Sequence, residues 1–206
     1  MKGKFIVIEG LDGAGKTLMI SMLKEVLPEN KFLFTREPGG THFAEKIRSI
    51  MSSDESREVG GESMFCLVWS ARVDHFKNKI LPALDKGINV ITDRFDLSTF
   101  AYQIYGEDLP RLEGLFFEVR EVFLKEHLPD AYIFLDVPVE ECLKRMSESK
   151  RKLDQFDKRG IDFHEKVLKG YQAWQEKTSS NFKVNANQRP ERVKEEILRI
   201  ISDITK

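Results

Sequence analysis

The sequence predicts an α/β fold in three layers, α/β/α, with a five-stranded parallel sheet in the middle. Short apolar runs alternate with longer stretches of helical periodicity along the chain. Most of these runs are continuously apolar rather than alternating, which is typical of parallel strands covered by helices on both faces. The 206 residues are 41% hydrophobic and 33% charged, so we expect one compact domain over residues 1–206.

The expected elements alternate regularly from the N-terminus. Strands are expected at residues 4–9, 31–35, 88–92, 131–136 and 181–185. Helices are expected at about 16–27, 41–52, 61–80, 111–126, 138–147, 161–178 and 190–204. Pro138 and Pro190 suit first helical turns, and Pro82 with Gly87 brackets the start of the third strand.

A glycine-rich loop follows the first expected strand. Residues 10–17 match the phosphate-loop pattern G-x-x-x-x-G-K-[ST], between a strand and a helix as that motif requires. Its glycines let backbone N–H groups turn inward on a phosphate chain, and the helix N-terminus adds partial positive charge. We expect Lys16 to reach the outer phosphates and Thr17 to hold a magnesium ion. The sequence therefore predicts nucleoside triphosphate binding at Gly10, Leu11, Asp12, Gly13, Ala14, Gly15, Lys16 and Thr17.

Charged side chains follow the second and third expected strands. Arg36 lies directly after the second strand, and Asp93 and Arg94 lie at the end of the third. Because the carboxyl ends of parallel strands meet at one edge of a sheet, we expect these side chains to face the phosphate loop. Guanidinium groups clamp phosphate bidentately, and a carboxylate suits a metal shell. The arrangement predicts a phosphoryl-transfer site.

Composition and charge argue against several classes of protein. The net charge of −1 gives no electrostatic case for a nucleic-acid partner. No stretch approaches the ~20 apolar residues of a membrane span, and the first apolar run is too short for a signal peptide. Cys66 and Cys142 lack metal or redox spacing and are expected to be buried thiols. We expect a cytoplasmic enzyme with small-molecule partners, neither nucleic acid nor membrane.

Several longer motifs are more specific than the phosphate loop. Residues 9–17, 35–41, 70–75, 93–103 and 135–137 occur in the order found in thymidylate kinases. The chain resembles the bacterial branch of that family, which belongs to the P-loop nucleoside monophosphate kinases. The resemblance implies phosphorylation of dTMP to dTDP with ATP and Mg²⁺, in dTTP biosynthesis.

The resemblance also implies roles for acceptor-binding residues. Asp12 would accept the 3′-hydroxyl of dTMP, and Arg36 and Arg94 would hold its monophosphate. Arg72 would donate to the base, and Tyr102 would disfavour a 2′-hydroxyl. The polar edge of the base would be lined by Ser98, Thr99 and Gln103.

Other implied roles concern ATP, the metal and catalysis. Asp93 would join Thr17 in the magnesium shell, and Arg145 would lie near the adenine. The groups implied to act in catalysis are Lys16, Arg94, Asp12 and one cation of a lid segment.

A cation-rich segment at about 147–160 is expected to form that lid over the triphosphate. It carries five Lys or Arg residues and few apolar anchors. Gly13 occupies the loop position at which another branch of the family carries a catalytic arginine, so the lid must supply the cation. The usual lid arginine is Gln155 here, and Arg151 is the expected replacement.

The base-binding side departs from the family pattern at Val68. Family members usually carry a phenylalanine there, which stacks on thymine. Phe65 and Trp69 are alternative partners for the base, and relaxed base selectivity is the other interpretation. A kinase for another deoxynucleoside or deoxynucleotide is therefore the alternative function.

The remaining alternatives concern catalysis and assembly. A regulatory GTPase would need a guanine-reading Asn/Thr-Lys-x-Asp element, and none follows the fourth expected strand. A nucleotide-binding protein without catalysis stays open. The family is commonly homodimeric, and stretches 61–80 and 111–126 carry more apolar residues than one buried face needs. We therefore expect a homodimer.

Overall fold

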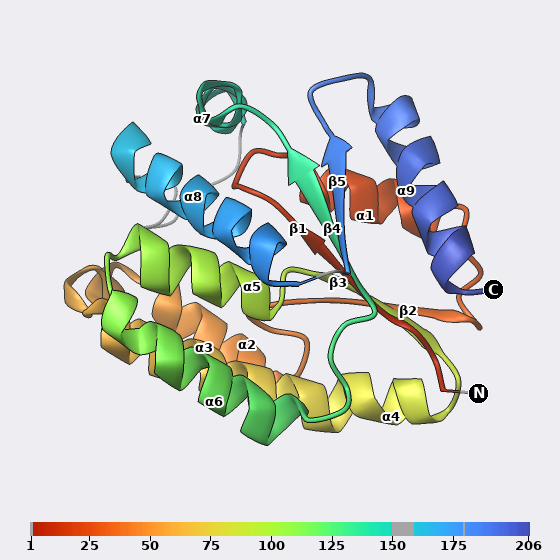
Figure 1. Ribbon diagram of the computed structural model, residues 1–206, viewed down its shortest axis with the longest axis horizontal. Coiled ribbons are helices and arrows are strands. Elements are labelled where there is room, and N and C mark those ends of the chain that lie inside the picture. The colour runs from red at the N-terminus through yellow and green to blue at the C-terminus, as the bar shows by residue number, and fades with distance from the viewer. Residues whose placement is uncertain (1, 150–158, 179) are drawn as a thin grey trace.

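Five parallel strands form the centre of the computed structural model, which describes residues 2–149, 159–178 and 180–206 (Figure 1). The strands are β1 (Phe5–Glu9), β2 (Phe32–Arg36), β3 (Asn89–Asp93), β4 (Ala131–Asp136) and β5 (Asn181–Asn185). Their order is β2-β3-β1-β4-β5, and every neighbouring pair is parallel. The expected five-stranded parallel sheet is confirmed.

Burial along the strands explains the continuous apolar runs. Every residue of β1 is buried, as are the first five residues of β4, because these strands lie inside the sheet and are covered by helices. The edge strands β2 and β5 keep exposed positions. The central place of β1 puts the loop that follows it at the carboxyl edge of the sheet, where ligands of such sheets bind.

Helices cover both faces of the sheet. They are α1 (Lys16–Lys24), α2 (His42–Met51), α3 (Gly61–His75), α4 (Leu81–Asp85), α5 (Asp96–Thr99), α6 (Glu113–Leu124), α7 (Val139–Glu148), α8 (Ile161–Lys177) and α9 (Pro190–Ile204). Shorter segments are the 3-10 helices η1 (Asp54–Glu58) and η4 (Pro110–Leu112) and the π-helices η2 (Phe76–Ile80) and η3 (Phe100–Gly106). In Figure 1, α1 and α9 lie on one side of the sheet and α3, α5, α6 and α8 on the other. This is the predicted three-layer arrangement.

Two helix ends differ from the prediction. Helical structure continues from α3 through η2 and α4 to Asp85, past Pro82, instead of ending at residue 80. Pro82 lies where the π-helix η2 passes into α4, so the hydrogen-bond pattern already changes at that point. At the N-terminal end of the chain, α1 ends at Lys24 rather than at residue 27.

The prediction places no helix between the third strand and residue 111, and this is wrong. The structure has a continuous helical segment there, formed by α5 and η3 from Asp96 to Gly106. All side chains of residues 99–104 are buried. A helix that is buried all round lacks the polar face by which an amphipathic pattern is recognised.

Helix α8 packs closely against this segment. A Cβ on Gly170 would lie 2.7 Å from Cα of Ala101, so glycine permits the close approach. Trp174 of α8 and Phe116 of α6 contact Phe100, with ring centroids 5.3 and 5.5 Å away. This aromatic cluster fixes α5 and η3 in place and with them the side chains that they direct toward the carboxyl edge of the sheet.

Candidate active site

The phosphate loop between β1 and α1 takes a conformation that depends on glycine. Gly10, Gly13 and Gly15 have φ values of 150°, 84° and 97°, which residues with a Cβ disfavour. A Cβ on Gly13 would also clash with the carbonyl oxygen of Cys142 in α7. Position 13, at which another branch of the family carries a catalytic arginine, therefore has no room for a side chain in this fold.

Lys16 lies buried inside the loop. Its ammonium group donates to the carbonyl oxygens of Gly10 and Leu11 at 3.0 and 2.8 Å, and it lies 4.0 Å from an oxygen of Asp12. Burial and the neighbouring charge of Arg94 lower the pKa of Lys16, against the opposing effect of nearby carboxylates. A phosphate in the loop would offer this ammonium group charged acceptors, which are stronger than the two carbonyls.

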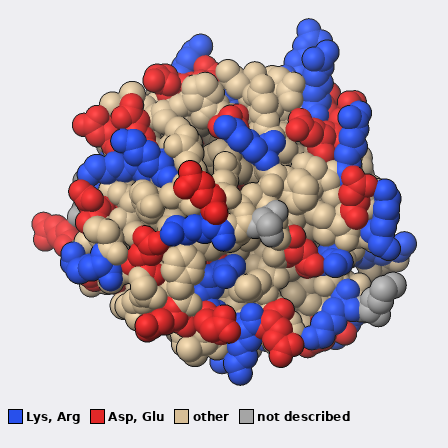
Figure 2. Space-filling model, viewed as in Figure 1, with Lys and Arg blue, Asp and Glu red and all other residues tan. Residues whose placement is uncertain are grey.

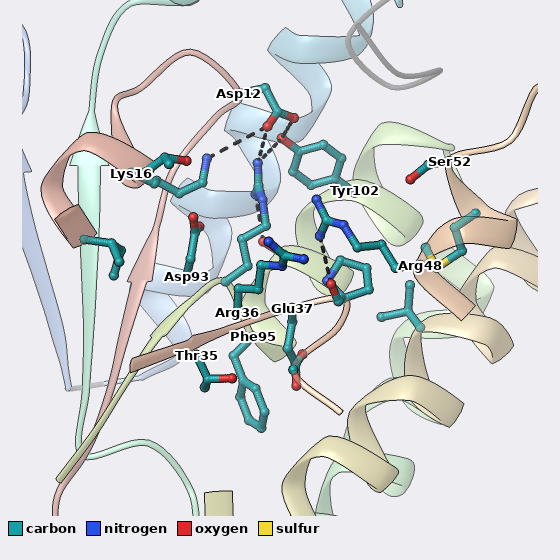
Figure 3. Close-up of a pocket in the computed structure, with 18 of the residues that line it drawn as sticks. Asp12, Lys16, Thr35, Arg36, Glu37, Arg48, Ser52, Asp93, Phe95 and Tyr102 are labelled. Carbon is teal, nitrogen blue, oxygen red and sulfur yellow. Dashed lines mark hydrogen bonds and ion pairs between the residues drawn. The ribbon is translucent and has the colours of Figure 1, made fainter. Parts of the chain in front are cut away.

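A cavity of about 740 Å³ opens beside the loop and brings most of the predicted site residues together (Figure 3). Those that line it are Asp12, Gly13, Gly15, Lys16, Thr17, Arg36, Val68, Arg72, Asp93, Arg94, Ser98, Thr99, Tyr102, Gln103 and Arg145. Gly10, Leu11 and Ala14 belong to the loop without lining this cavity. Helix α2 supplies residues that the sequence analysis did not assign, namely Glu45, Arg48 and Met51.

Arg94, directly after β3, lines the cavity. It adopts a left-handed backbone conformation, with φ of 68°, which is uncommon for a residue with a side chain. Its guanidinium donates to Asp12 at 2.7 Å, to the hydroxyl of Ser98 at 2.9 Å and to that of Tyr102 at 3.1 Å. Tyr102 donates in turn to the second oxygen of Asp12 at 2.8 Å, and the two side chains lie together in Figure 3. The groups predicted to bind phosphate and 3′-hydroxyl are thus bonded to each other.

The charges of this cluster fix its protonation states. Burial alone would raise the pKa of Asp12, but the charges of Arg94 and Lys16, with hydrogen bonds from Tyr102 and Arg94, outweigh burial and lower it. Burial works against the charge of Arg94, yet Asp12 and its other neighbours raise the pKa of the guanidinium. Burial raises the pKa of Tyr102. At neutral pH Asp12 is therefore a carboxylate acceptor, Arg94 a cation and Tyr102 a donor.

Glu9, at the end of β1, is a buried carboxylate that the sequence analysis did not assign. It accepts the backbone N–H groups of Phe95 and Ser98 at 2.9 and 3.1 Å and the hydroxyl of Ser98 at 2.6 Å. It thereby caps the N-terminus of α5, whose own N-cap residue makes no side-chain hydrogen bond. Burial raises the pKa of Glu9, although Arg94 and these hydrogen bonds oppose the rise. The sequence signal for a role of Glu9 in the site is its position as an acidic residue at the end of a fully buried strand.

Tyr171 of α8 is a second unassigned residue of the cluster. Its hydroxyl lies 3.0 Å from the guanidinium of Arg94 and 3.1 Å from the hydroxyl of Ser98, and it donates to Glu9 at 3.1 Å. In the sequence this tyrosine is one of several apolar or aromatic positions of a long amphipathic helix. Nothing in its spacing distinguishes it from a core residue.

Arg72, predicted to contact the base, is buried at the floor of the cavity. Its Nε donates to Glu37 at 2.7 Å, one terminal nitrogen donates to the hydroxyl of Thr99 at 2.9 Å and the other to the carbonyl oxygen of Phe95 at 2.9 Å. The guanidinium stacks on Trp69, 4.7 Å from the ring centroid. An arginine has five N–H groups, so the three partners found in the described part of the chain leave donors for a ligand.

The three candidate base contacts on α3 do not all point in the same direction. Val68 lines the cavity. Phe65 and Trp69 pack in the hydrophobic core, with ring centroids 6.3 Å apart, and neither is among the described residues that line the cavity. The helix therefore directs Phe65 into the core, away from the cavity that Val68 lines.

The segment after β2 is held by side chains of α2. Arg36, on the exposed rim, donates to both oxygens of Glu45 at 3.1 and 3.0 Å, and the same carboxylate accepts the N–H of Gly40 at 2.9 Å. Arg48 donates to the carbonyl oxygen of Pro38 at 2.8 Å. Burial opposes a low pKa for Glu45, but the hydrogen bonds from Gly40 and Arg36 lower it. Arg36 is thus already paired with an anionic group at the cavity rim.

Asp93 and Thr17 suit a magnesium ion. One carboxylate oxygen of Asp93 is buried and has no hydrogen-bond partner among the described residues, and both residues line the cavity. Figure 3 shows Asp93 below Lys16 on the same side of the cavity. No cluster of three or more His, Cys, Asp or Glu that could hold a metal occurs in the described ranges. Magnesium needs no such cluster, because it keeps several waters and uses one or two protein oxygens.

The predicted lid lies mainly outside the described residues. Arg151 and Gln155 are among its residues that the structure does not describe. Of its cations, Arg159 is described, and it donates to Glu107 at 2.8 Å. Arg145, at the end of α7, lies 2.9 Å from Glu141 and 3.0 Å from the amide oxygen of Asn187. It lines both the main cavity and a neighbouring one of about 300 Å³, which is bordered by the phosphate loop and the start of α9.

The surface can be compared with the expectations in charge, helix hydrophobicity and exposure of the cysteines. Acidic and basic side chains are intermixed over the face shown in Figure 2. No helix in the described part of the chain is long and apolar enough to cross a membrane. Cys142 is buried, as expected, but Cys66 is exposed, so the expectation of two buried thiols is wrong. The apolar residues around Cys66 in the sequence suggest burial, but Cys66 lies on an exposed face of α3.

Comparisons with known proteins agree along nearly the whole chain. A family model described as thymidylate kinase matches residues 8–197. The thymidylate kinase of Francisella philomiragia is 36% identical over 203 residues, covering 96% of this chain and 97% of that protein. The thymidylate kinase of Marinomonas sp. is 39% identical over 202 residues, covering 96% and 93%.

A solved structure shares the fold. The crystal structure of thymidylate kinase from Ehrlichia chaffeensis superposes with a TM-score of 0.77 over 98% of this chain and 100% of that chain. Its sequence identity is 24%, so this likeness concerns the fold.

Proposed function

The chain belongs to the thymidylate kinase family and phosphorylates dTMP with a nucleotide as phosphate donor, and we propose that it uses ATP and Mg²⁺ in the cavity described above. The observation that carries the assignment of the site is the single cluster of Asp12, Arg94, Ser98 and Tyr102 beside the phosphate loop. We further propose that the chain works as one domain, with ATP and dTMP entering the same cavity.

The acceptor nucleotide is proposed to span the cluster. Arg94 and Arg36 hold its 5′-phosphate, and Asp12 accepts its 3′-hydroxyl, which the ionised state of that carboxylate favours. Tyr102, bonded to both Asp12 and Arg94, stands beside the sugar and leaves little room for a 2′-hydroxyl. The base lies toward Arg72 and Val68, with Ser98, Thr99 and Gln103 along its polar edge.

The donor nucleotide is proposed to lie on the phosphate loop. Backbone N–H groups of residues 13–17 and the N-terminus of α1 would bind its phosphates, with Lys16 on the outer ones. Arg145 would cover the adenine, in the smaller cavity beside α9. Because phosphoryl transfer has a loose, charge-spread transition state, catalysis rests on positioning and positive charge, supplied by Lys16, Arg94 and, from the lid, Arg151.

The proposed metal site consists of Thr17 and Asp93. The unpartnered buried oxygen of Asp93 is the observation that supports it. When bound, Mg²⁺ would neutralise charge on the donor phosphates. The protein's own part is to hold the two oxygen ligands on neighbouring elements, α1 and β3.

Relaxed base selectivity, the alternative raised by Val68, is not favoured by the family comparisons. A valine still packs against the methyl group of thymine, so the substitution changes the quality of the contact rather than its chemistry. The acceptor we propose is dTMP.

The proposed assembly is a homodimer through α6. Leu115, Val122 and Phe123 of that helix are exposed at 44%, 61% and 37%, whereas Phe65, Val68, Phe76 and Ile80 of the 61–80 stretch are buried. An exposed apolar helix face of this kind suits a second copy of the chain. Measuring the mass in solution tests this, with V122E as the disrupting variant. A cytoplasmic location is part of the proposal, since ATP and dTMP are metabolites of that compartment.

A panel of acceptors tests the proposed reaction. ADP release from ATP and Mg²⁺ is measured with dTMP, dUMP, dCMP, dGMP and thymidine. We expect the highest kcat/KM with dTMP and no turnover in the variant Lys16→Ala. Turnover of another acceptor in preference to dTMP would contradict the proposal, and ATP binding without any turnover would identify a non-catalytic binding protein.

A further inference from the structure

A chain of hydrogen bonds lies behind Arg72, and the proposed function does not use it. The hydroxyl of Thr35 is 2.7 Å from Nε2 of His75, and Nδ1 of His75 is 3.0 Å from one oxygen of Glu37. The other oxygen of Glu37 accepts from Nε of Arg72 at 2.7 Å, and Arg72 donates to Thr99. These contacts connect β2, the segment after it, α3 and α5 into one network, which we call the Arg72 support chain.

Every titratable side chain of the support chain is buried. His75 is 0%, Arg72 2% and Glu37 5% exposed. A buried carboxylate needs partners for both oxygens, and each oxygen of Glu37 has a different one, Arg72 or His75. The position of the carboxylate between these two groups therefore determines where the Arg72 guanidinium rests.

The imidazole of His75 has no room to move. A Cβ on Gly40 would clash with its ring and would lie 2.7 Å from the hydroxyl of Thr35, so the backbone of Gly40 lies directly against both groups. Lys79 fixes the same stretch of backbone by donating to the carbonyl oxygen of Gly40 at 2.9 Å. Figure 3 shows Thr35 and Glu37 together near Phe95, below Arg36. The ring therefore cannot shift to keep a weakened contact with Glu37. Loss of the contact between His75 and Glu37 would instead change the position of the Glu37 carboxylate.

Loss of that contact would redirect the guanidinium. With one oxygen of Glu37 released, the carboxylate gains most by turning both oxygens to Arg72, because bidentate pairs of this kind are strong. A second N–H group of Arg72 would then be used inside the protein. Fewer donors would remain for the base, and they would point elsewhere.

We propose that His75 is a positioning residue for base recognition: by holding Glu37, it fixes the Arg72 guanidinium with its remaining N–H groups toward the base of the acceptor. The proposal rests on the proposed function, since it needs Arg72 to meet the base. Donors at this place suit the carbonyl oxygens of thymine. They disfavour cytosine, which presents an amino group at the corresponding edge.

A pair of conservative variants separates the two contacts of His75. The amide nitrogen of asparagine is as many bonds from Cβ as Nδ1 of histidine, and that of glutamine as many as Nε2. His75→Asn therefore keeps a donor for Glu37 and loses Thr35, whereas His75→Gln keeps Thr35 and loses Glu37. The values measured are kcat and KM for dTMP and dCMP, and KM for ATP.

We expect His75→Gln to raise KM for dTMP about 10-fold and to lower the dTMP-to-dCMP ratio of kcat/KM about 10-fold, with KM for ATP within about 3-fold. His75→Asn is expected to stay within about 3-fold of the parent chain in both values. The control is His164→Gln, because His164 of α8 is also fully buried but bonds to the carbonyl oxygen of Gly160, the residue before that helix. Its dTMP-to-dCMP ratio should not change.

Two results would overturn the proposal. One is a parent-like ratio in His75→Gln. The other is a ratio that falls in both His75 variants in proportion to their loss of melting temperature, which indicates a structural role alone. If the parent chain does not turn over dTMP, the proposed function fails, and calorimetric binding of dTMP and dCMP to the same variants decides on His75 by the same two criteria.

Discussion

Arg94 and Asp12 are bonded directly to each other, with a guanidinium nitrogen 2.7 Å from a carboxylate oxygen. Arg94 directly follows β3 and Asp12 lies in the phosphate loop, and we propose that they bind the 5′-phosphate and the 3′-hydroxyl of one nucleotide. Their contact fixes the position of both groups before the nucleotide arrives. Such preorganisation lowers the cost of aligning acceptor and donor.

Asp12→Asn tests the 3′-hydroxyl contact. The amide keeps the size of the side chain but loses the negative charge that the neighbouring Arg94 and Lys16 stabilise. We expect kcat/KM for dTMP to fall about 10- to 100-fold, and to fall much less for the 3′-deoxy analogue of dTMP, which has no hydroxyl to accept. Steady-state kinetics with the two acceptors measures this difference. Equal losses with both acceptors would show that Asp12 acts only through Arg94.

Arg151→Ala tests the source of the lid cation. Because Gly13 has no room for a side chain beside Cys142, the loop cannot supply an arginine, and we propose Arg151 instead. We expect kcat to fall by about 10³ or more with KM for dTMP little changed, since the charge acts on the transferring phosphoryl group.

Arg159→Ala is the matched control for the lid. It removes a cation of the same segment, but one that is paired with Glu107 and stacked on Phe163, 5.1 Å from the ring centroid. Its kcat should stay within about 3-fold of the parent chain. A large loss in Arg159→Ala with a small one in Arg151→Ala would reassign the catalytic cation.

Asp93→Asn tests the metal site. The substitution weakens an oxygen ligand that is buried and lacks a partner among the described residues. We expect the Mg²⁺ concentration for half-maximal activity to rise about 10-fold, with kcat partly recovered at saturating Mg²⁺. A magnesium titration at fixed ATP measures it, and chelation should abolish activity in the parent chain. An unchanged magnesium requirement would remove Asp93 from the shell.

The sequence predicts the sheet and the phosphate loop well, because both depend on local patterns. Continuous apolar runs such as residues 5–8 predict buried strands, and the glycines of residues 10–15 predict the loop. The helical segment Asp96–Gly106 escapes the same reasoning, since none of its residues is exposed and it has no polar face to reveal a period.

The partners within the site are less accessible to sequence reasoning. Glu9 and Ser98, or Glu37 and His75, are far apart in the chain, and only the packing of β1, β2, α3 and α5 brings them together. Phe65 illustrates the same limit in reverse. Its position one turn before Val68 suggests that Phe65 lies on the same side of α3 as Val68. In the structure, α3 instead directs Phe65 into the hydrophobic core.

The buried carboxylate of Glu9 predicts a dependence of stability on pH. Burial raises its pKa above the ordinary 4.5, so in the pH range just above 4.5 the folded chain binds more protons than the unfolded chain. The difference between the folded and unfolded pKa of Glu9 therefore stabilises the fold fully below pH 4.5. This stabilisation is lost as the pH rises through the raised folded pKa. Glu9→Gln removes this titration.

Urea unfolding of the parent chain and Glu9→Gln from about pH 4 to about pH 8 measures the effect. We expect the free energy of unfolding of the parent chain, minus that of the variant, to decrease as the pH rises. Glu45→Gln is the control of opposite sign, because the pKa of Glu45 is lowered from 4.5 by Gly40 and Arg36 against the effect of burial. The contribution of Glu45 is present above pH 4.5 and lost as the pH falls through its folded pKa, so its difference should increase with pH. If the Glu9 difference also increased with pH, the charge of Arg94 and the hydrogen bonds from Ser98 and Phe95 would outweigh burial, and the direction assigned to the pKa of Glu9 would be wrong.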